Sequence, residues 1–183
     1  VDLKSDRIVG CEALLRIIGE DGAHLDPREM IGAAEDGGLI RRIEETVLQR
    51  AASAARLMPE VGADAVFVSV NVSDRRVLDR RSPLALAHTL YNADLPAEQV
   101  YLELHPSAIA GKGPGTRLIT QLRALGVCVV IDEFLGANDT DHVGPDPLTF
   151  VKLDKRLVHG IHGDRGRARA ALVIDSITDR GVD

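Results

Sequence analysis

Short apolar runs alternate with segments of helical periodicity along most of this chain. Apolar and β-branched runs predict strands at residues 7–12, 65–73, 99–104, 127–131 and 149–154. Apolar positions spaced i, i+3, i+4 and i+7 predict amphipathic helices between and after them, at residues 27–35, 40–55, 83–92, 116–125 and 165–179. Because strands alternate with helices through short connections, the pattern predicts an α/β fold built on a parallel sheet.

Turn and capping residues support these boundaries. Asp26 is a suitable N-cap for a helix whose first position is Pro27. Asp21-Gly22 predicts a turn, Gly126 predicts the end of the helix before it, and Pro59 the end of the long helix that starts at residue 40.

Composition narrows the class of protein. The chain has 183 residues, which suits a single domain with one core, and it begins at Val1 and ends at Asp183 like a piece of a longer protein. A net charge of −6, only 3% aromatic residues and no Trp argue against a general nucleic-acid binder. Cys11 and Cys128 lie in apolar runs without metal-ligand spacing, so we expect reduced thiols and a cytoplasmic location. No apolar run is long enough to predict a membrane span.

Polar residues recur late in each predicted strand or directly after it. They are Glu12, Asn71, Glu103, the pair Asp132-Glu133, and Lys152. The carboxyl ends of parallel strands meet at one edge of a sheet or barrel, where catalytic residues gather. A buried, unpaired carboxylate is costly, so these acids predict a site that contains basic partners or metal ions.

Several motifs in this order resemble one known family. The chain carries Glu12-Ala13-Leu14-Leu15-Arg16, then an Ala-Glu-x-x-Gly-Leu-Ile run at 34–40, Val-Asn-x-Ser at 70–73, Leu-Glu-Leu at 102–104, Asp-Glu-Phe at 132–134 and Lys-Leu-Asp at 152–154. Together they resemble the EAL family of cyclic-di-GMP phosphodiesterases, and the resemblance covers essentially the whole chain.

The resemblance implies a TIM-like (β/α)8 barrel and a single domain over residues 1–183. A closed barrel of this type typically needs about 250 residues, so we expect the barrel to be incomplete at both ends. The implied reaction is hydrolysis of the bacterial second messenger cyclic di-GMP to the linear dinucleotide with Mg²⁺ or Mn²⁺ in a two-metal site. Because members of this family often form homodimers and are often fused to sensor or diguanylate cyclase domains, the resemblance implies a homodimer and a fused domain of either kind outside this chain as candidate partners, beside cyclic di-GMP.

The resemblance also assigns roles by position. Lys152 and Glu12 are the implied catalytic residues, and Arg16 and Asp154 are the implied substrate contacts. The implied metal ligands are Glu12, Asn71, Glu103, Asp132 and Glu133, whose oxygen atoms suit hard divalent cations.

Each assignment has a structural alternative. Glu12, Asp132 and Lys152 could form an internal ion-pair cluster, and Asn71 could satisfy a backbone group at the end of its strand. Arg16 could be a surface residue, and Asp154 an ordinary cap. A lone His after a strand is usually structural, so no catalytic role is assigned to His105.

Departures from the family pattern bear on catalysis. Glu133 stands where the family has a second Asp, and one extra methylene displaces its carboxylate. Residues 135–140 replace the family's Gly-Thr-Gly-Tyr-Ser-Ser loop, and Pro106 replaces the Glu that anchors it. A later Glu-bearing strand of the family would fall beyond Asp183.

Two functions therefore follow as hypotheses. The first is a cyclic-di-GMP phosphodiesterase of weakened activity, favoured by the retained ligands. The second is a degenerate EAL domain that acts as a cyclic-di-GMP receptor or a protein-interaction module, favoured by the departures. An unrelated metal-dependent barrel hydrolase explains the strand-end acids but not the ordered motifs.

Overall fold

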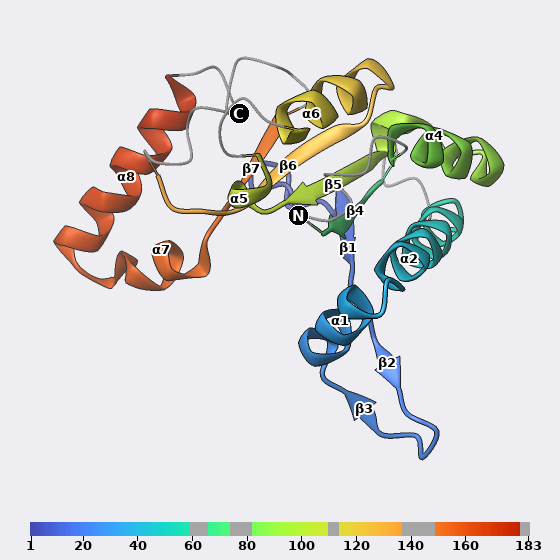
Figure 1. The fold of residues 1–183 in the computed structure, drawn as a ribbon. Coiled ribbons are helices and arrows are strands. Elements are labelled where there is room, and N and C mark those ends of the chain that lie inside the picture. Colours follow the sequence, from blue (N-terminus) through green and yellow to red (C-terminus); the bar gives the residue numbers. More distant parts are fainter. Residues whose placement is uncertain (59–65, 74–81, 110–113, 137–148, 180–183) are drawn as a thin grey trace.

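A five-stranded parallel sheet forms the centre of the protein (Figure 1). The computed structural model describes residues 1–58, 66–73, 82–109, 114–136 and 149–179. The expected helix end at Pro59 and positions 137–140 of the altered loop lie outside these residues. The strands, in their spatial order, are β1 (Gly10–Ala13), β4 (Phe67–Val72), β5 (Val100–Leu104), β6 (Cys128–Phe134) and β7 (Thr149–Leu153).

Each strand pairs in parallel with its neighbour in this order, as the alternation of strands and helices predicts. The sheet curls like half of a TIM-like barrel, which confirms the expected α/β architecture. The five strands of this sheet do not close into a ring within the described residues. Helix α1 (Pro27–Asp36) lies beyond the end of β1, beside α2 (Figure 1). The helices that pack against the sheet are α2 (Ile40–Ala55), α4 (Ser82–Ala93), α6 (Pro114–Ala124) and α8 (Asp164–Thr178).

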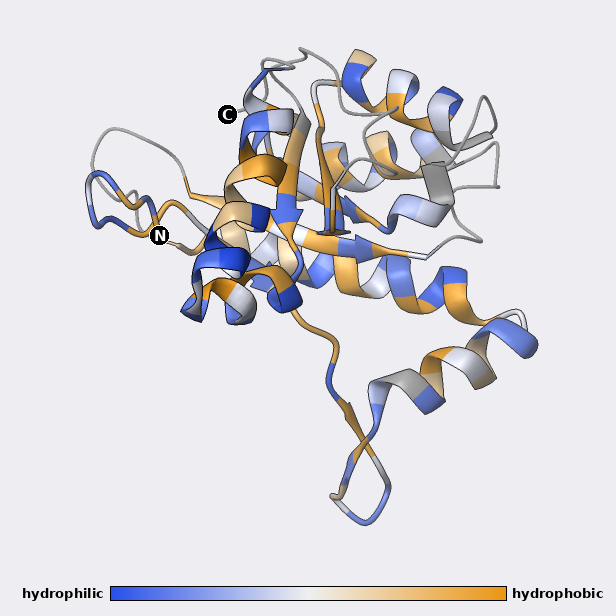
Figure 2. Cartoon of the chain, turned by 90° about the vertical axis from the view of Figure 1, so that its left-hand side faces the viewer, coloured by the Kyte–Doolittle hydropathy of each residue, from blue (hydrophilic) through white to orange (hydrophobic). Residues whose placement is uncertain are grey.

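The main core lies between the outer face of the sheet and these helices. Strand residues alternate between two faces, so Val68, Leu102 and Val129 all point outward and are almost fully buried. Leu48 of α2 and Leu122 of α6 belong to the same cluster. Figure 2 shows the strands mostly in the hydrophobic colour, whereas the helices carry both colours, as amphipathic covering helices do.

The inner face of the sheet carries an aromatic layer followed by a polar one. The rings of Phe67 and Tyr101 stack with centroids 4.0 Å apart, and Phe150 lies 4.8 Å from Tyr101. Two residues further along β5 and β7, on the same face, stand Glu103 and Lys152. The aromatic layer thus forms the floor of the polar cluster.

Some boundaries and short elements differ from expectation. The strand expected at 127–131 extends to Phe134, so Asp132 and Glu133 lie within β6 rather than after it. Its pairing with β7 continues beyond an irregularity between Ile131 and Phe134. The elements that were not predicted are all short: β2 (Ile17–Ile18), β3 (His24–Leu25), α5 (Pro106–Ile109), α7 (Lys155–His159) and the 3-10 turns Ala97–Gln99 and Gly160–His162. Among the described residues, no helix has the length and hydrophobicity needed to cross a membrane.

Candidate functional site

Lys152 stands at the centre of an acidic cluster on the inner face of the sheet. Its Nζ lies 2.8 Å from Oε2 of Glu103, 3.0 Å from Oε2 of Glu12 and 3.9 Å from Oδ1 of Asp132. Asn71 donates from Nδ2 to Oε1 of Glu12 at 2.9 Å. The structure therefore brings together five of the predicted site residues, one from each strand of the sheet.

Burial is uneven across the cluster. The side chain of Glu103 is only 3% exposed, whereas that of Lys152 is 41% exposed. Glu12 and Asp132 are partly exposed, so one side of the cluster is open to a ligand. A carboxylate as deeply buried as Glu103 needs a cation, and the Lys152 ammonium supplies it.

The pKa values of the cluster follow from this arrangement. Burial opposes the charge on Lys152, but the hydrogen bonds to Glu103 and Glu12 outweigh it and raise the Lys152 pKa above its ordinary value. Burial likewise opposes the charge on Glu12. Hydrogen bonds from Asn71 and Lys152 outweigh that effect and lower the Glu12 pKa. Both groups are therefore charged at neutral pH.

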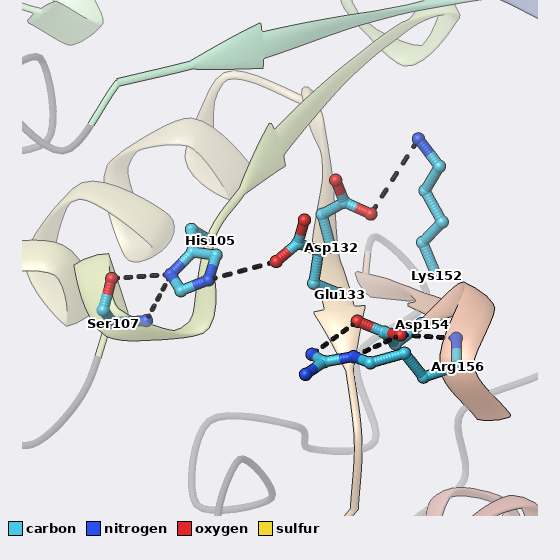
Figure 3. Close-up of polar contacts among 7 residues, drawn as sticks. All are labelled: His105, Ser107, Asp132, Glu133, Lys152, Asp154 and Arg156. Atoms are coloured by element: carbon cyan, nitrogen blue, oxygen red, sulfur yellow. Dashed lines mark hydrogen bonds and ion pairs between the residues drawn. The ribbon is translucent and has the colours of Figure 1, made fainter. Parts of the chain in front are cut away.

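Glu133, the neighbour of Asp132, is directed to a different partner (Figure 3). Its Oε2 lies 3.5 Å from Nε2 of His105. The Nδ1 of His105 accepts the backbone N–H of Ser107 and lies 2.6 Å from the Ser107 hydroxyl, so the imidazole is held at the start of α5. Glu133 has a left-handed φ of 48°. None of its described contacts reaches Lys152.

Asp154 caps the helix that follows β7. Its Oδ1 accepts the backbone N–H of Arg156, and the Arg156 guanidinium binds both carboxylate oxygens at 2.8–2.9 Å. The side-chain hydrogen bond with Arg156, helped by the backbone N–H, lowers the Asp154 pKa to about 2. The Asp154 carboxylate is thus fully engaged within the protein, as the cap interpretation expects.

Arg16 lies apart from the acidic cluster. Its guanidinium donates to the carbonyl of Leu15 and lines a cavity between α1 and α2. No described contact joins it to the Lys152 cluster.

Sequence reasoning did not identify Arg156 or the His105–Ser107 pair as neighbours of the site. The capping signal at Asp154 was present, but α7 is only five residues long and has no apolar periodicity. His105 directly precedes Pro106, which occupies the favoured first position of α5. A His directly before a helix-starting Pro is therefore a sequence signal for an imidazole that contacts the first turn of the helix.

The described residues form a parallel half-barrel, and on its inner face three acids surround Lys152. The chain belongs to the EAL domain family, because the profile of the EAL domain matches residues 1–183.

Related proteins agree with this assignment. The chain is 31% identical over 186 residues to the uncharacterized protein Rv1357c of Mycobacterium tuberculosis, covering 100% of this chain and 60% of that protein. It is 31% identical over 153 residues to the cyclic di-GMP phosphodiesterase NbdA of Pseudomonas aeruginosa, covering 82% of this chain and 19% of NbdA. This chain therefore spans less than two thirds of either relative.

Solved structures share the fold. The EAL enzyme Bd1971, in a form bound to cAMP and cyclic di-GMP, matches 100% of this chain and 51% of its own with a TM-score of 0.88 and 23% identity. At this identity the likeness concerns the fold.

Proposed function

We propose that this domain is a divalent-metal-dependent phosphodiesterase that hydrolyses cyclic di-GMP to the linear dinucleotide, in the cytoplasm. The observation that carries the proposal is the convergence of Glu12, Glu103 and Asp132 on Lys152, with Asn71 bound to Glu12. The relative named as a cyclic di-GMP phosphodiesterase supports the choice of substrate.

The donor types fit Mg²⁺ or Mn²⁺. Three carboxylates and an amide oxygen come from four strands, and hard divalent cations prefer such oxygen ligands. Within the described residues these carboxylates surround the Lys152 ammonium, and no three His, Cys, Asp or Glu side chains converge as a ready metal-binding group. The chemistry supplied by a bound pair of such ions is activation of a water and stabilisation of the leaving oxygen.

The residues of the chain itself have distinct roles in this proposal. Lys152, kept protonated by its carboxylate partners, donates hydrogen bonds to the negative charge that develops on the phosphate oxygens. Asn71 orients the carboxylate of Glu12 through its amide N–H. Arg16 is a phosphate contact in this proposal only through its position in the family motif, since a guanidinium matches phosphate geometry. Its guanidinium donates to the Leu15 carbonyl and lines the cavity between α1 and α2 rather than the Lys152 cluster. Asp154 would contact the ligand only through a carboxylate already shared with Arg156.

The second candidate is a cyclic-di-GMP receptor or protein-interaction module without catalysis. The position of Glu133 favours it, since this carboxylate contacts His105 instead of the cluster in which a second metal ion would need it. A misplacement near 1 Å can lower a rate about 100-fold.

Calorimetric titration of cyclic di-GMP in Ca²⁺, followed by exchange to Mn²⁺ and chromatography of the products, separates these functions. We expect binding in Ca²⁺ and slow formation of the linear dinucleotide in Mn²⁺. Glu103→Gln should abolish turnover. Glu98→Gln, a change at an exposed acid two residues before β5, is the matched control and should leave turnover unchanged.

Binding with no product over many hours would exclude the enzyme and support the receptor. Absence of binding would exclude both cyclic-di-GMP functions and leave the interaction module. Equal turnover in Glu103→Gln and the native protein would show that the acidic cluster is not the catalytic site.

A further inference from the structure

A second cavity, of about 890 Å³, lies on the opposite side of β1 from the Lys152 cluster. It is an open cavity bounded by the segment that follows β1, by α1 and by α2, and we call it the α1–α2 cavity. In Figure 1, α1 and the β2–β3 hairpin project from the end of the sheet beneath β1, beside α2. Its walls are mainly aliphatic and include Leu14, Met30, Ile43 and Val47.

The α1–α2 cavity is separate from the acidic cluster. Glu12 and Ala13 are successive residues of β1 and point to opposite faces of the strand. Glu12 lines the inner-face pocket with Glu103 and Lys152, whereas Ala13 lines the α1–α2 cavity. The two sets of lining residues share no member among the described residues.

The charged residues at this cavity are all basic. Arg16, Arg42 and Arg50 contribute to the lining, and no Asp or Glu does so among the described residues. Arg42 and Arg50 lie eight residues apart on α2, on either side of Thr46, so they form one stripe along the helix. Neither has an ion pair with a described residue. In a chain of net charge −6, this is a local concentration of positive charge that no described acid neutralises, and it lies beside an apolar surface.

The geometry points to a binding site for a small amphiphilic anion, an aliphatic chain that ends in a carboxylate. The aliphatic walls remove the chain from water, and Arg42 and Arg50 bind the head group at the rim. The volume lies within the range of small-molecule sites, about 300–1,000 Å³, which favours a small molecule over a partner protein. This site goes beyond the proposed phosphodiesterase function. Arg16, among the described lining residues, is also assigned to that function, whereas Arg42 and Arg50, which bind the head group here, are not.

Direct titration with dodecanoate, below the concentration at which it forms micelles, tests the proposal, with the uncharged dodecanol as the comparison ligand. A dansylated undecanoate provides a fluorescent probe for competition, and the protein contains no Trp to interfere with it. We expect saturable binding of dodecanoate and of the probe, and much weaker binding of dodecanol.

Substitutions on α2 test the role of the arginines. Arg42→Gln and Arg50→Gln should each weaken dodecanoate binding about 5- to 10-fold. The matched control is Arg41→Gln, because Arg41 is on the same helix, pairs with Glu45 and does not line the cavity. It should change binding by less than about twofold. Ala33→Phe, at an exposed lining position of α1, should block binding by filling the cavity while circular dichroism shows a native fold.

Three results would overturn the proposal. The first is absence of binding, and the second is equal binding of dodecanoate and dodecanol with no effect of Arg42→Gln or Arg50→Gln. The third is stoichiometric displacement of the probe by cyclic di-GMP, which would place the cavity in the nucleotide site. Failure of cyclic di-GMP to bind at all would overturn only the proposed function, because the dodecanoate titration does not involve it.

Discussion

Lys152 and Glu103 form a 2.8 Å ion pair in which the carboxylate is buried and the ammonium remains accessible. The asymmetry matters because the deeply buried partner loses the most hydration and depends most on its counter-ion. Glu12 and Asp132 place further negative charge around the same Nζ. The three carboxylates thus form a cation-binding cluster, and the Lys152 ammonium is the cation that they bind.

Replacement of Lys152 should therefore destabilise the fold as well as the proposed chemistry. Lys152→Met keeps the aliphatic stem but leaves Glu103 buried without a cation. We expect the free energy of unfolding in urea to fall by about 1–3 kcal/mol, less than for a fully buried pair because Lys152 is partly solvated. Lys155→Met, at an exposed position two residues after β7, is the control and should change little.

Divalent cations give this prediction a second measurement. If the carboxylates can accept Mg²⁺ in place of the ammonium, millimolar Mg²⁺ should raise the stability of Lys152→Met more than that of the Lys155→Met control. Equal stability of the two variants without Mg²⁺ would show that Glu103 does not depend on Lys152.

Gly10 is required by the aromatic floor of the site. A Cβ on Gly10 would lie 2.4 Å from the ring of Phe67, which itself stacks on Tyr101 and has little freedom to move. Gly10→Ala should therefore lower the free energy of unfolding by about 1–3 kcal/mol, measured in urea.

Gly32 offers the matched substitution. It lies within α1, and a Cβ there would meet nothing within 4 Å. Gly32→Ala should raise stability by about 0.5–1 kcal/mol, because Gly is a poor helix former. Similar effects of the two substitutions would contradict the proposed clash.

The sheet and the acidic cluster could be predicted from the sequence because both follow from local periodicity. A strand that alternates between two faces places Tyr101 and Glu103 together on one face and Leu102 on the other. Parallel strands then bring the late polar residues to one edge. That logic predicted the positions of Glu12, Asn71, Glu103, Asp132 and Lys152.

The direction of Glu133 could not be predicted in this way. It follows Asp132 in a strand with an irregularity, and its backbone adopts a left-handed conformation that no pattern of side chains indicates. The engagement of Asp154 by Arg156 was missed for a related reason, since it depends on a five-residue helix with no periodicity.

The Asp154–Arg156 pair should make stability depend on pH in acid. The Asp154 pKa is about 2 in the folded protein, whereas the ordinary pKa of an Asp carboxyl is 3.8, so the stabilisation is present above about pH 4 and is lost as the pH falls toward 2. Asp154→Asn should remove this part of the acid sensitivity, so that the stability difference from the native protein shrinks from pH 5 to pH 2.

Urea unfolding at several pH values in this window provides the measurement. Asp164→Asn, a change at an exposed acid that begins α8, is a suitable control. A stability difference for Asp154→Asn that stays constant between pH 5 and pH 2 would contradict the assigned pKa.

Backbone strain at Glu133 gives the last prediction. A left-handed φ of 48° is unfavourable for a residue with a Cβ and accessible to Gly. Glu133→Gly should therefore be more stable than Glu133→Ala by about 1 kcal/mol in urea. At Glu20, which lacks a positive φ, the order should reverse, because Gly there only adds freedom to the unfolded chain.

The contact with His105 contributes little to the stability of this Glu133 conformation. The two side chains are 3.5 Å apart and each is more than half exposed, so loss of their contact should change stability by less than about 0.5 kcal/mol. His105→Asn is the suitable variant, because the Asn Oδ1 can still accept the Ser107 N–H that His105 Nδ1 accepts. The conformation of Glu133 is then set by the irregular pairing of β6 with β7 rather than by its partner. A loss of stability in His105→Asn as large as the difference between Glu133→Gly and Glu133→Ala would instead assign the conformation to the His105 contact.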